Sequence, residues 1–144
     1  MTRVLKIGGN QLDDPAFIAG TAQAVKMMDD LPVIVHGGGK AILALQEKLG
    51  IPANYIGGLR VTDAATLSLV KMVLCGQSNV DLVAALVNAG VEAQGFNGAD
   101  RGLLRAVKLT HPDGDLDRVG RVTAVRGDVI RDCLAAKVVP VIAP

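Results

Sequence analysis

Two short apolar segments near the N-terminus are predicted to be strands of one parallel sheet. Val4–Ile7 and Pro32–His36 lack the alternation of apolar and polar residues that a half-exposed strand shows. Such runs are typical of strands that helices cover on both faces. Each run stops at consecutive glycines, Gly8–Gly9 in the first case and Gly37–Gly39 in the second.

Segments with helical spacing follow both strands. Asp14 and Pro15 are a helix start signal, because aspartate caps a helix and proline suits its first turn. Apolar residues recur at helical spacing over residues 15–28, and a shorter amphipathic helix is expected over residues 41–50, ending at Gly50. The order strand–helix–strand–helix predicts a parallel sheet with right-handed crossovers.

The middle of the chain is predicted to form a hairpin and then two helices. Residues 51–63 hold a pair of glycines between short β-like pieces, which suggests a hairpin or flap. Asp63, or Thr62, can cap a helix over residues 64–76. A second helix is expected over residues 78–90.

The last third of the chain returns to strands. Residues 91–96 are predicted to be a strand, and residues 102–110 and 120–125 an antiparallel pair around a turn-rich segment. A helix over residues 128–137 and a buried strand over residues 138–144 complete the expected α/β fold, whose sheet is mainly parallel.

Composition narrows the functional classes. The chain has 144 residues, half of them apolar, and no linker, so we expect one domain over residues 1–144. A net charge of +1 and only 2% aromatic residues argue against a nucleic-acid partner. No apolar run reaches membrane-spanning length and the N-terminus lacks a signal-peptide core, so we expect a cytoplasmic protein without a membrane partner. Cys75 and Cys133 lie outside any metal-ligand spacing and are interpreted as buried, reduced thiols.

The two glycine turns are the candidate chemistry. Ligands of parallel α/β sheets bind at the carboxyl ends of the strands, where both turns fall. Successive glycines let several backbone N–H groups converge on one anion, and a following helix adds its N-terminal dipole. Lys6 lies two residues before Gly8, and its ammonium is expected to reach a phosphate there.

Other interpretations of these glycines compete with anion binding. The chain lacks the GxxxxGK[ST] pattern of a P-loop and the spacing of a GxGxxG loop. An HGGG stretch also forms the oxyanion hole of esterases, but the nearest nucleophile-elbow candidate, Gly76–Val80, lacks its second glycine. A simple tight turn at Gly37–Gly39 and an edge or solvent-facing position for Lys6 remain as alternatives.

Arg60 is a candidate anchor for a carboxylate. It follows two glycines in the predicted flap and has apolar neighbours. A guanidinium presents a planar fork of donors that matches a carboxylate. A surface arginine on a hairpin is the alternative, and the two anion-binding turns nearby favour the anchor.

Taken together, the segments "KIGGN", "VIVHGGGK" and "GGLRVTDAATL" resemble the amino-acid kinase family. The third segment is similar to the one that separates acetylglutamate kinases from aspartate, glutamate, uridylate and carbamate kinases. The resemblance covers essentially the whole chain. It implies a three-layer α/β/α sandwich and ATP-dependent phosphorylation of the γ-carboxylate of N-acetyl-L-glutamate, in arginine biosynthesis.

The resemblance also implies roles on the phosphate-donor side. By position in the motif, Lys6 would stabilise the transferring phosphoryl group, and Gly8 and Gly9 would hold the phosphates of ATP. Mg²⁺ is implied by ATP rather than by any carboxylate cluster in the chain, so no residue is predicted to ligate a metal.

On the acceptor side, Gly38 and Gly39 would bind the reacting end of the substrate through their backbone N–H groups, and Arg60 would bind its α-carboxylate. The helix from Ala64 to Leu74 is apolar on most of its surface, which predicts a homodimer or a higher homo-oligomer.

Members of this family are considerably longer than this chain. The resemblance therefore implies an N-terminal, acetylglutamate-binding half, without the C-terminal half that carries the nucleotide-base site. Two alternatives stay open: a kinase of lysine biosynthesis that acts on carrier-linked aminoadipate, and a non-catalytic domain that binds the substrate only.

Overall fold

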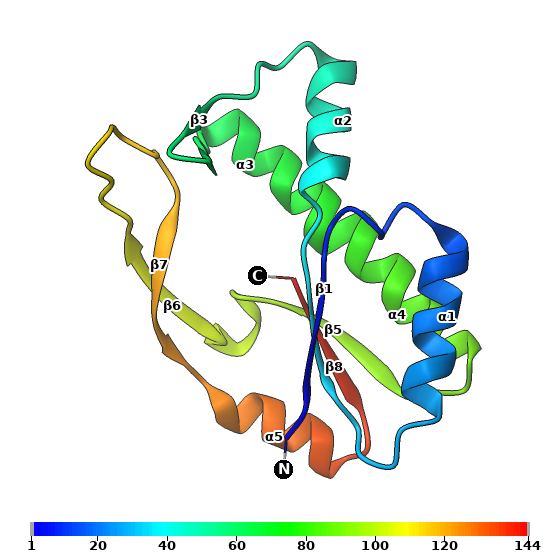
Figure 1. The fold of residues 1–144 in the computed structure, drawn as a ribbon. Helices are drawn as coiled ribbons and strands as arrows, with labels where there is room; N and C mark the ends of the chain where they lie inside the picture. The colour runs from blue at the N-terminus through cyan, green and yellow to red at the C-terminus, as the bar shows by residue number, and fades with distance from the viewer. Residues whose placement is uncertain (1, 144) are drawn as a thin grey trace.

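A computed structural model describes residues 2–143 (Figure 1). Its centre is a sheet of four parallel strands in the order β1 (Val4–Ile7), β2 (Val33–His36), β8 (Val139–Ala143) and β5 (Ala93–Asn97). The parallel sheet predicted from the apolar runs is confirmed. All five residues of β8 are buried, as expected of a strand with neighbours on both sides and helices on both faces.

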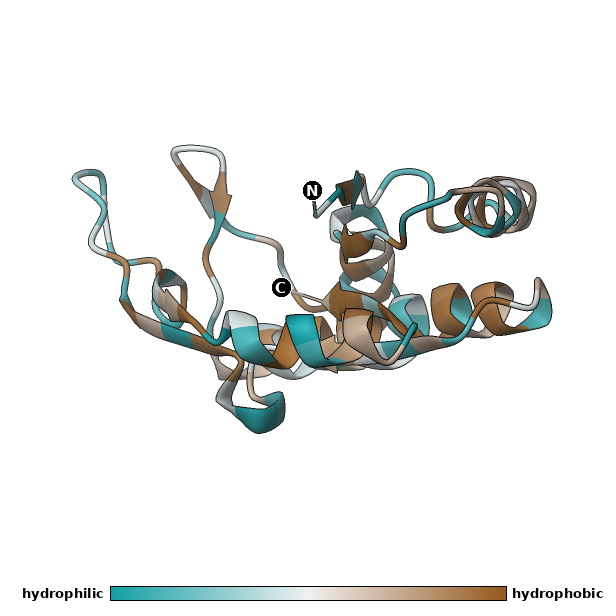
Figure 2. Cartoon of the chain, turned by 90° about the horizontal axis from the view of Figure 1, so that it is seen from below, coloured by the Kyte–Doolittle hydropathy of each residue, from teal (hydrophilic) through white to brown (hydrophobic). Residues whose placement is uncertain are grey.

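Helices cover both faces of this sheet and make three layers. The helices α1 (Pro15–Lys26) and α4 (Asn79–Asn88) pack on one face, and α5 (Gly127–Ala135) packs on the other. Alternate residues of a strand point to opposite faces, so Val141 of β8 packs with α1 and α4, whereas Ile142 packs with α5. In Figure 2 the helices carry hydrophobic and hydrophilic residues in turn, which fits helices with one face in the core.

The predicted caps and turns of the first half are confirmed. The Asp14 side chain accepts a hydrogen bond from the Ala16 N–H, with Pro15 in the first turn of α1. The helix α2 (Gly39–Leu49) begins two residues earlier than predicted and ends at Gly50, which adopts a left-handed conformation.

The expected flap is a hairpin of two short strands, β3 (Tyr55–Ile56) and β4 (Leu59–Arg60), joined by two glycines with positive φ. Figure 1 shows this hairpin beside the N-terminal end of α3.

A second hairpin extends from the body of the molecule. Its strands are β6 (Leu104–Lys108) and β7 (Gly120–Val125), and a single 3₁₀ turn, η2 (Asp100–Gly102), precedes them. The loop that joins β6 to β7 contacts the flap segment, because the Arg118 N–H donates to the Thr62 carbonyl at 3.0 Å. The antiparallel pair predicted from sequence is confirmed.

The two helices predicted for residues 64–76 and 78–90 are one continuous rod. It consists of α3 (Ala64–Val70), a π-helical segment η1 (Lys71–Ser78) and α4, so the predicted break at Gly76 is wrong. Asp63 caps the rod at its start, by accepting from the Thr66 N–H at 2.7 Å. The Ser78 side chain makes no capping hydrogen bond, since the backbone is helical on both sides of it.

The rod spans 25 residues and is apolar enough to cross a membrane by length and composition alone. One third of its most apolar window is buried inside the protein. Leu82 and Leu86 pack among α1 and the sheet, and Val73 and Leu74 pack against α2. These contacts are those of a core helix.

Candidate functional site

The two glycine turns lie against each other at the carboxyl ends of β1 and β2. The Gly37 N–H donates to the Ile7 carbonyl at 3.0 Å, which joins the ends of the two strands. A Cβ atom on Gly9 would lie only 2.4 Å from the Gly38 nitrogen and 2.8 Å from the Gly39 nitrogen. Glycine is therefore required at position 9 by the close approach of two backbones. The two turns therefore lie in direct contact at one edge of the sheet.

The second turn is also enclosed from the side of the rod. A Cβ atom on Gly38 would lie 2.4 Å from Cδ2 of Leu74 and 3.6 Å from Oγ of Ser78. By contrast, a Cβ on Gly8 or on Gly39 would have nothing within 4 Å. The site is thus closed around Gly38 and open around Gly8 and Gly39.

Backbone N–H groups gather in this space. Gly38 is the N-cap of α2 and has no side chain to satisfy the first N–H groups of that helix. Among residues 2–143, no hydrogen bond is formed by the N–H groups of Gly8, Gly9, Gly38 or Gly39. Free N–H groups at a helix N-terminus favour an anionic ligand.

Arg60 is held at the start of α2. Its Nη1 donates to Oε1 of Gln46, its Nη2 lies 3.4 Å from the Gly39 carbonyl oxygen, and its guanidinium lies 4.9 Å from the centre of the Tyr55 ring. Gln46 is fully buried, and its Nε2 also donates to the Pro52 carbonyl at 3.4 Å. The structure therefore brings Arg60 to the second glycine turn, with its orientation fixed by Gln46 and Tyr55.

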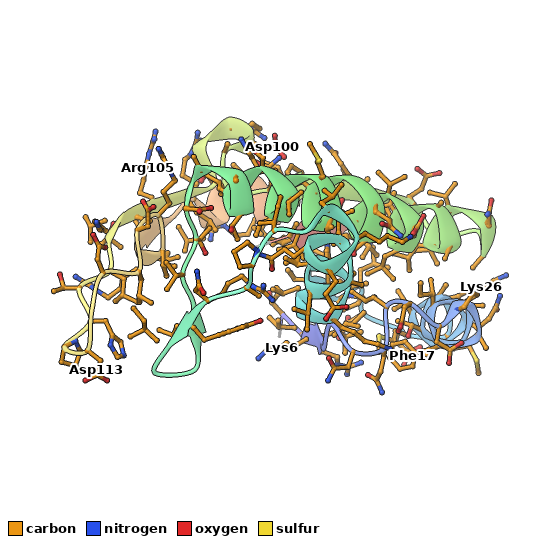
Figure 3. The ribbon with its side chains drawn as sticks, turned by 90° about the horizontal axis from the view of Figure 1, so that it is seen from above. Lys6, Phe17, Lys26, Asp100, Arg105 and Asp113 are labelled. Atoms are coloured by element: carbon orange, nitrogen blue, oxygen red, sulfur yellow. The ribbon has the colours of Figure 1, made fainter. Side chains whose placement is uncertain are left out.

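Lys6 lies on the opposite face of β1 from Leu5 and Ile7, which pack under α1. It is exposed, because β1 is an edge strand and the residues of this sheet face that pack with α5 lie on β2, β8 and β5. Figure 3 shows Lys6 apart from Phe17 of α1. Lys6 therefore has the edge, solvent-facing position that is one of the two interpretations of its sequence. In this position its ammonium can also contact a ligand beside Gly8.

One exposed ion pair joins the segments that follow the two turns. Lys40, in the first turn of α2, donates to the Asp13 carboxylate in the loop after β1. The hydrogen bond from Lys40 lowers the pKa of Asp13 below its usual value. Because both side chains are about half exposed, solvent weakens the pair, and it adds little to the stability of the site.

The sequence interpretation missed two buried polar residues behind the second turn. His36 and Asn79 are both buried and are 3.0 Å apart, from Nε2 of the histidine to Nδ2 of the asparagine. Burial lowers the pKa of His36, although its hydrogen bond to Gly37 acts in the opposite direction. Their sequence signal was weak: one histidine at a strand end, and one asparagine in a helix otherwise rich in apolar residues.

Within residues 2–143, no group of three or more His, Cys, Asp or Glu side chains could hold a metal ion. Cys133 is buried and Cys75 is only half-buried, so the expectation of two buried thiols is right for Cys133 alone. Burial raises the pKa of both thiols, which keeps them protonated at neutral pH.

Comparison with known proteins identifies the family and the fold. The sequence profile of the Amino acid kinase family matches residues 1–144. An acetylglutamate kinase of Roseiflexus sp. (strain RS-1) is 57% identical over 143 residues, covering 99% of this chain and 55% of that protein. The chain thus spans about half the length of the curated relatives it matches.

Solved structures agree with the sequence relatives. The crystal structure of smu.665 from Streptococcus mutans UA159 has a TM-score of 0.79 and 31% identity, over 98% of this chain and 57% of that one. An N-acetylglutamate synthase of Neisseria gonorrhoeae, complexed with coenzyme A and N-acetyl-glutamate, also has a TM-score of 0.79. At 23% identity, over 98% of this chain and 32% of that one, it supports the fold alone. The fold, the paired glycine turns and the match along the whole sequence lead to one conclusion: the chain belongs to the amino acid kinase family.

Proposed function

We propose that residues 1–144 are the N-terminal, acetylglutamate-binding half of an ATP-dependent kinase that phosphorylates the γ-carboxylate of N-acetyl-L-glutamate, in the cytoplasm, as a step of arginine biosynthesis. The observation that carries this proposal is the backbone contact between Gly9 and Gly38, because it sets two anion-binding turns side by side. Phosphoryl transfer between two anions needs such an arrangement. The 57% identity to an acetylglutamate kinase supports the choice of substrate.

In this proposal the second turn holds the acceptor. The N–H groups of Gly38 and Gly39 bind the γ-carboxylate, helped by the N-terminal dipole of α2. Arg60 binds the α-carboxylate from its position beside Gly39, using the guanidinium hydrogens that Gln46 and Gly39 leave free.

The first turn and Lys6 serve the donor. The N–H groups of Gly8 and Gly9 and the ammonium of Lys6 bind the phosphates of ATP. A γ-carboxylate oxygen then bonds to the γ-phosphorus while the bond from phosphorus to the bridging oxygen breaks, and ADP leaves. The carboxylate is already ionised, so no general base is required, and positioning and charge neutralisation supply the catalysis.

Mg²⁺ would bind with the nucleotide. The residues around the two turns fit phosphate, through N–H groups and an ammonium, but they include no carboxylate set for a divalent ion. The phosphates of ATP would therefore hold the ion on this side of the site, where it would neutralise the charge that develops on the phosphoryl oxygens.

The protein is also proposed to be a homodimer or a higher homo-oligomer. Three large apolar side chains of the rod are more than half exposed: Met72 at 62%, Val80 at 59% and Val87 at 53%. Val80 and Val87 lie beside Val83 and Ala84 around one surface pocket, and an exposed apolar surface of this kind favours association between copies. Light scattering at micromolar concentration should give at least twice the monomer mass, and a monomer would contradict this part of the proposal.

The activity is tested by trapping the acyl phosphate with hydroxylamine. A chain of the length of the curated relatives, supplied with ATP, Mg²⁺ and N-acetyl-L-glutamate, should form the hydroxamate, whereas residues 1–144 alone should bind acetylglutamate without forming it. A full-length chain that is inactive on acetylglutamate but active on carrier-linked aminoadipate would overturn the assignment of the substrate.

A further inference from the structure

A chain of buried hydrogen bonds connects the rod to the second glycine turn. Asn79 Nδ2 donates to the Val141 carbonyl at 3.1 Å and lies 3.0 Å from His36 Nε2. His36 Nδ1 lies 3.0 Å from the carbonyl oxygen of Gly37. Both side chains are almost fully buried, so water cannot replace these partners without cost.

The Val141 carbonyl at one end of this series of hydrogen bonds determines which group donates in each of them. The Val141 carbonyl can only accept, so the amide nitrogen of Asn79, and not its oxygen, must face it. That same nitrogen donates to His36 Nε2, which must then be the unprotonated ring nitrogen. The proton of the neutral ring therefore lies on Nδ1 and is donated to the Gly37 carbonyl.

This last hydrogen bond orients a peptide of the candidate site. The Gly37 carbonyl and the Gly38 N–H belong to one trans peptide, in which the two groups point in opposite directions. With the carbonyl turned to the imidazole, the Gly38 N–H points away from the imidazole. Glycines on both sides of this peptide give it unusual freedom to rotate, so a fixed partner matters.

The surroundings of Asn79 are shaped to admit its side chain. A Cβ atom on Gly95 of β5 would lie 2.0 Å from Oδ1 of Asn79, so only glycine leaves room there. The π-helical segment ends at the residue before Asn79. Its wide turns bring Leu74 and Ser78 onto Gly38 while Asn79 reaches the sheet. π-Helical turns are rare and costly, and they occur often at functional sites.

We propose that His36 and Asn79 are positioning residues that hold the Gly37–Gly38 peptide in the orientation that directs the Gly38 N–H to the acceptor carboxylate. This inference rests on the proposed function, because it assigns a purpose to the N–H that acetylglutamate would meet. Neither residue touches the substrate: His36 acts through the peptide, and Asn79 acts through His36.

Two substitutions of His36 separate positioning from simple packing. In His36→Asn, the amide nitrogen takes the place of Nδ1 and can still donate to the Gly37 carbonyl. In His36→Gln, the amide oxygen of the longer side chain takes the place of Nε2, so it keeps only the hydrogen bond from Asn79. Calorimetry with N-acetyl-L-glutamate should show a loss of affinity of about tenfold or more for His36→Gln, as expected for a misplaced hydrogen bond to a charged group. His36→Asn should stay within about threefold of the unchanged chain. Equal losses, or the reverse order, would overturn the proposal.

A second measurement needs neither a variant nor the substrate. The ¹⁵N chemical shifts of the His36 ring in the unchanged chain should identify a neutral imidazole protonated at Nδ1 at pH 7. A ring protonated at Nε2 could not donate to Gly37 and would overturn the inference even if acetylglutamate binds. If the chemical shifts agree but acetylglutamate does not bind the unchanged protein, the proposed function is wrong. The buried hydrogen bonds would then orient the Gly38 N–H for a different anion.

Discussion

The first and second glycine turns have similar sequences but very different surroundings. The second turn is enclosed around its middle glycine, because Leu74 and Ser78 lie against Gly38 and His36 binds the Gly37 carbonyl. Gly39 has open space where a Cβ would lie, and Arg60 contacts its carbonyl oxygen. The first turn contacts the second through Gly9, but a Cβ on Gly8 would meet nothing, and Lys6 beside it is exposed.

The difference bears on the two roles proposed for these turns. An enclosed turn with fixed peptides is preorganised, so it can bind its ligand without loss of conformational freedom. The first turn is open around Gly8 and has the exposed Lys6 beside it, so fewer contacts hold its peptides in place. In the proposed function, this difference is the reason to place the acceptor at the second turn and the donor at the first.

The largest expected effect concerns Lys6, on the open side. In a full-length chain, Lys6→Ala should lower kcat about 100- to 1,000-fold, as the loss of one transition-state contact does, with little change in KM for acetylglutamate. Steady-state kinetics give both constants. The free energy of unfolding of residues 1–144 should not change, since Lys6 is exposed. An unchanged kcat would remove Lys6 from the mechanism.

The contact between the turns is tested by a matched pair of alanines. Gly9→Ala places a methyl group against the Gly38 backbone and should cost about 2 kcal/mol or more of stability, because backbone cannot move aside cheaply. Gly8→Ala adds the same methyl group in open space and is the control. Urea unfolding compares them, and equal stabilities would show that the turns do not press together as described.

Arg60 tests the enclosed side. Arg60→Ala should weaken the binding of N-acetyl-L-glutamate by about 1.5–3 kcal/mol, the typical contribution of a hydrogen bond to a charged group. Calorimetry measures this loss. Gln46→Leu is a useful companion, because it leaves the guanidinium in place but removes its buried acceptor, and a smaller loss is expected. Unchanged affinity in Arg60→Ala would exclude Arg60 as the carboxylate anchor.

The smallest expected effect is a dependence of stability on pH that His36, beside the second turn, should cause. Burial lowers the pKa of His36 in the folded state, so protons bind the unfolded chain more tightly and favour unfolding. The free energy of unfolding should therefore be unaffected by His36 above about pH 6.5, the pKa of histidine in the unfolded chain. Below that pH it should fall, by no more than about 1.4 kcal/mol per pH unit for one proton. Urea unfolding at several pH values should show a shallower decline in His36→Asn, and identical curves would contradict the burial argument.

Most of the fold was predictable, because buried parallel strands and capped helices leave local signals. The apolar runs, Asp14 with Pro15, and Gly50 all marked elements correctly. The rod was not predictable in the same way. Val73 and Leu82 are both buried yet nine residues apart, about two and a half turns of an α-helix, so they would face opposite sides of a regular one. The apolar pattern changes phase there, beside Gly76, and imitates a break.

The residues of the candidate site also differ in how far the sequence could predict them. The glycines of the two turns and Arg60 could be singled out as candidates because residue type and short spacing mark them in the sequence. The contact of Gly9 with Gly38, and the hydrogen bonds of Asn79 to Val141 and His36, join residues far apart in sequence. Such contacts depend on the packing of the whole sheet and leave no local pattern.

The central claim is that this chain by itself forms the acceptor site, and calorimetric titration of residues 1–144 with N-acetyl-L-glutamate tests it most directly. We expect saturable binding with one site per chain, and much weaker binding of ATP under the same conditions, because the donor side is open. Binding of ATP without binding of N-acetyl-L-glutamate would contradict the account.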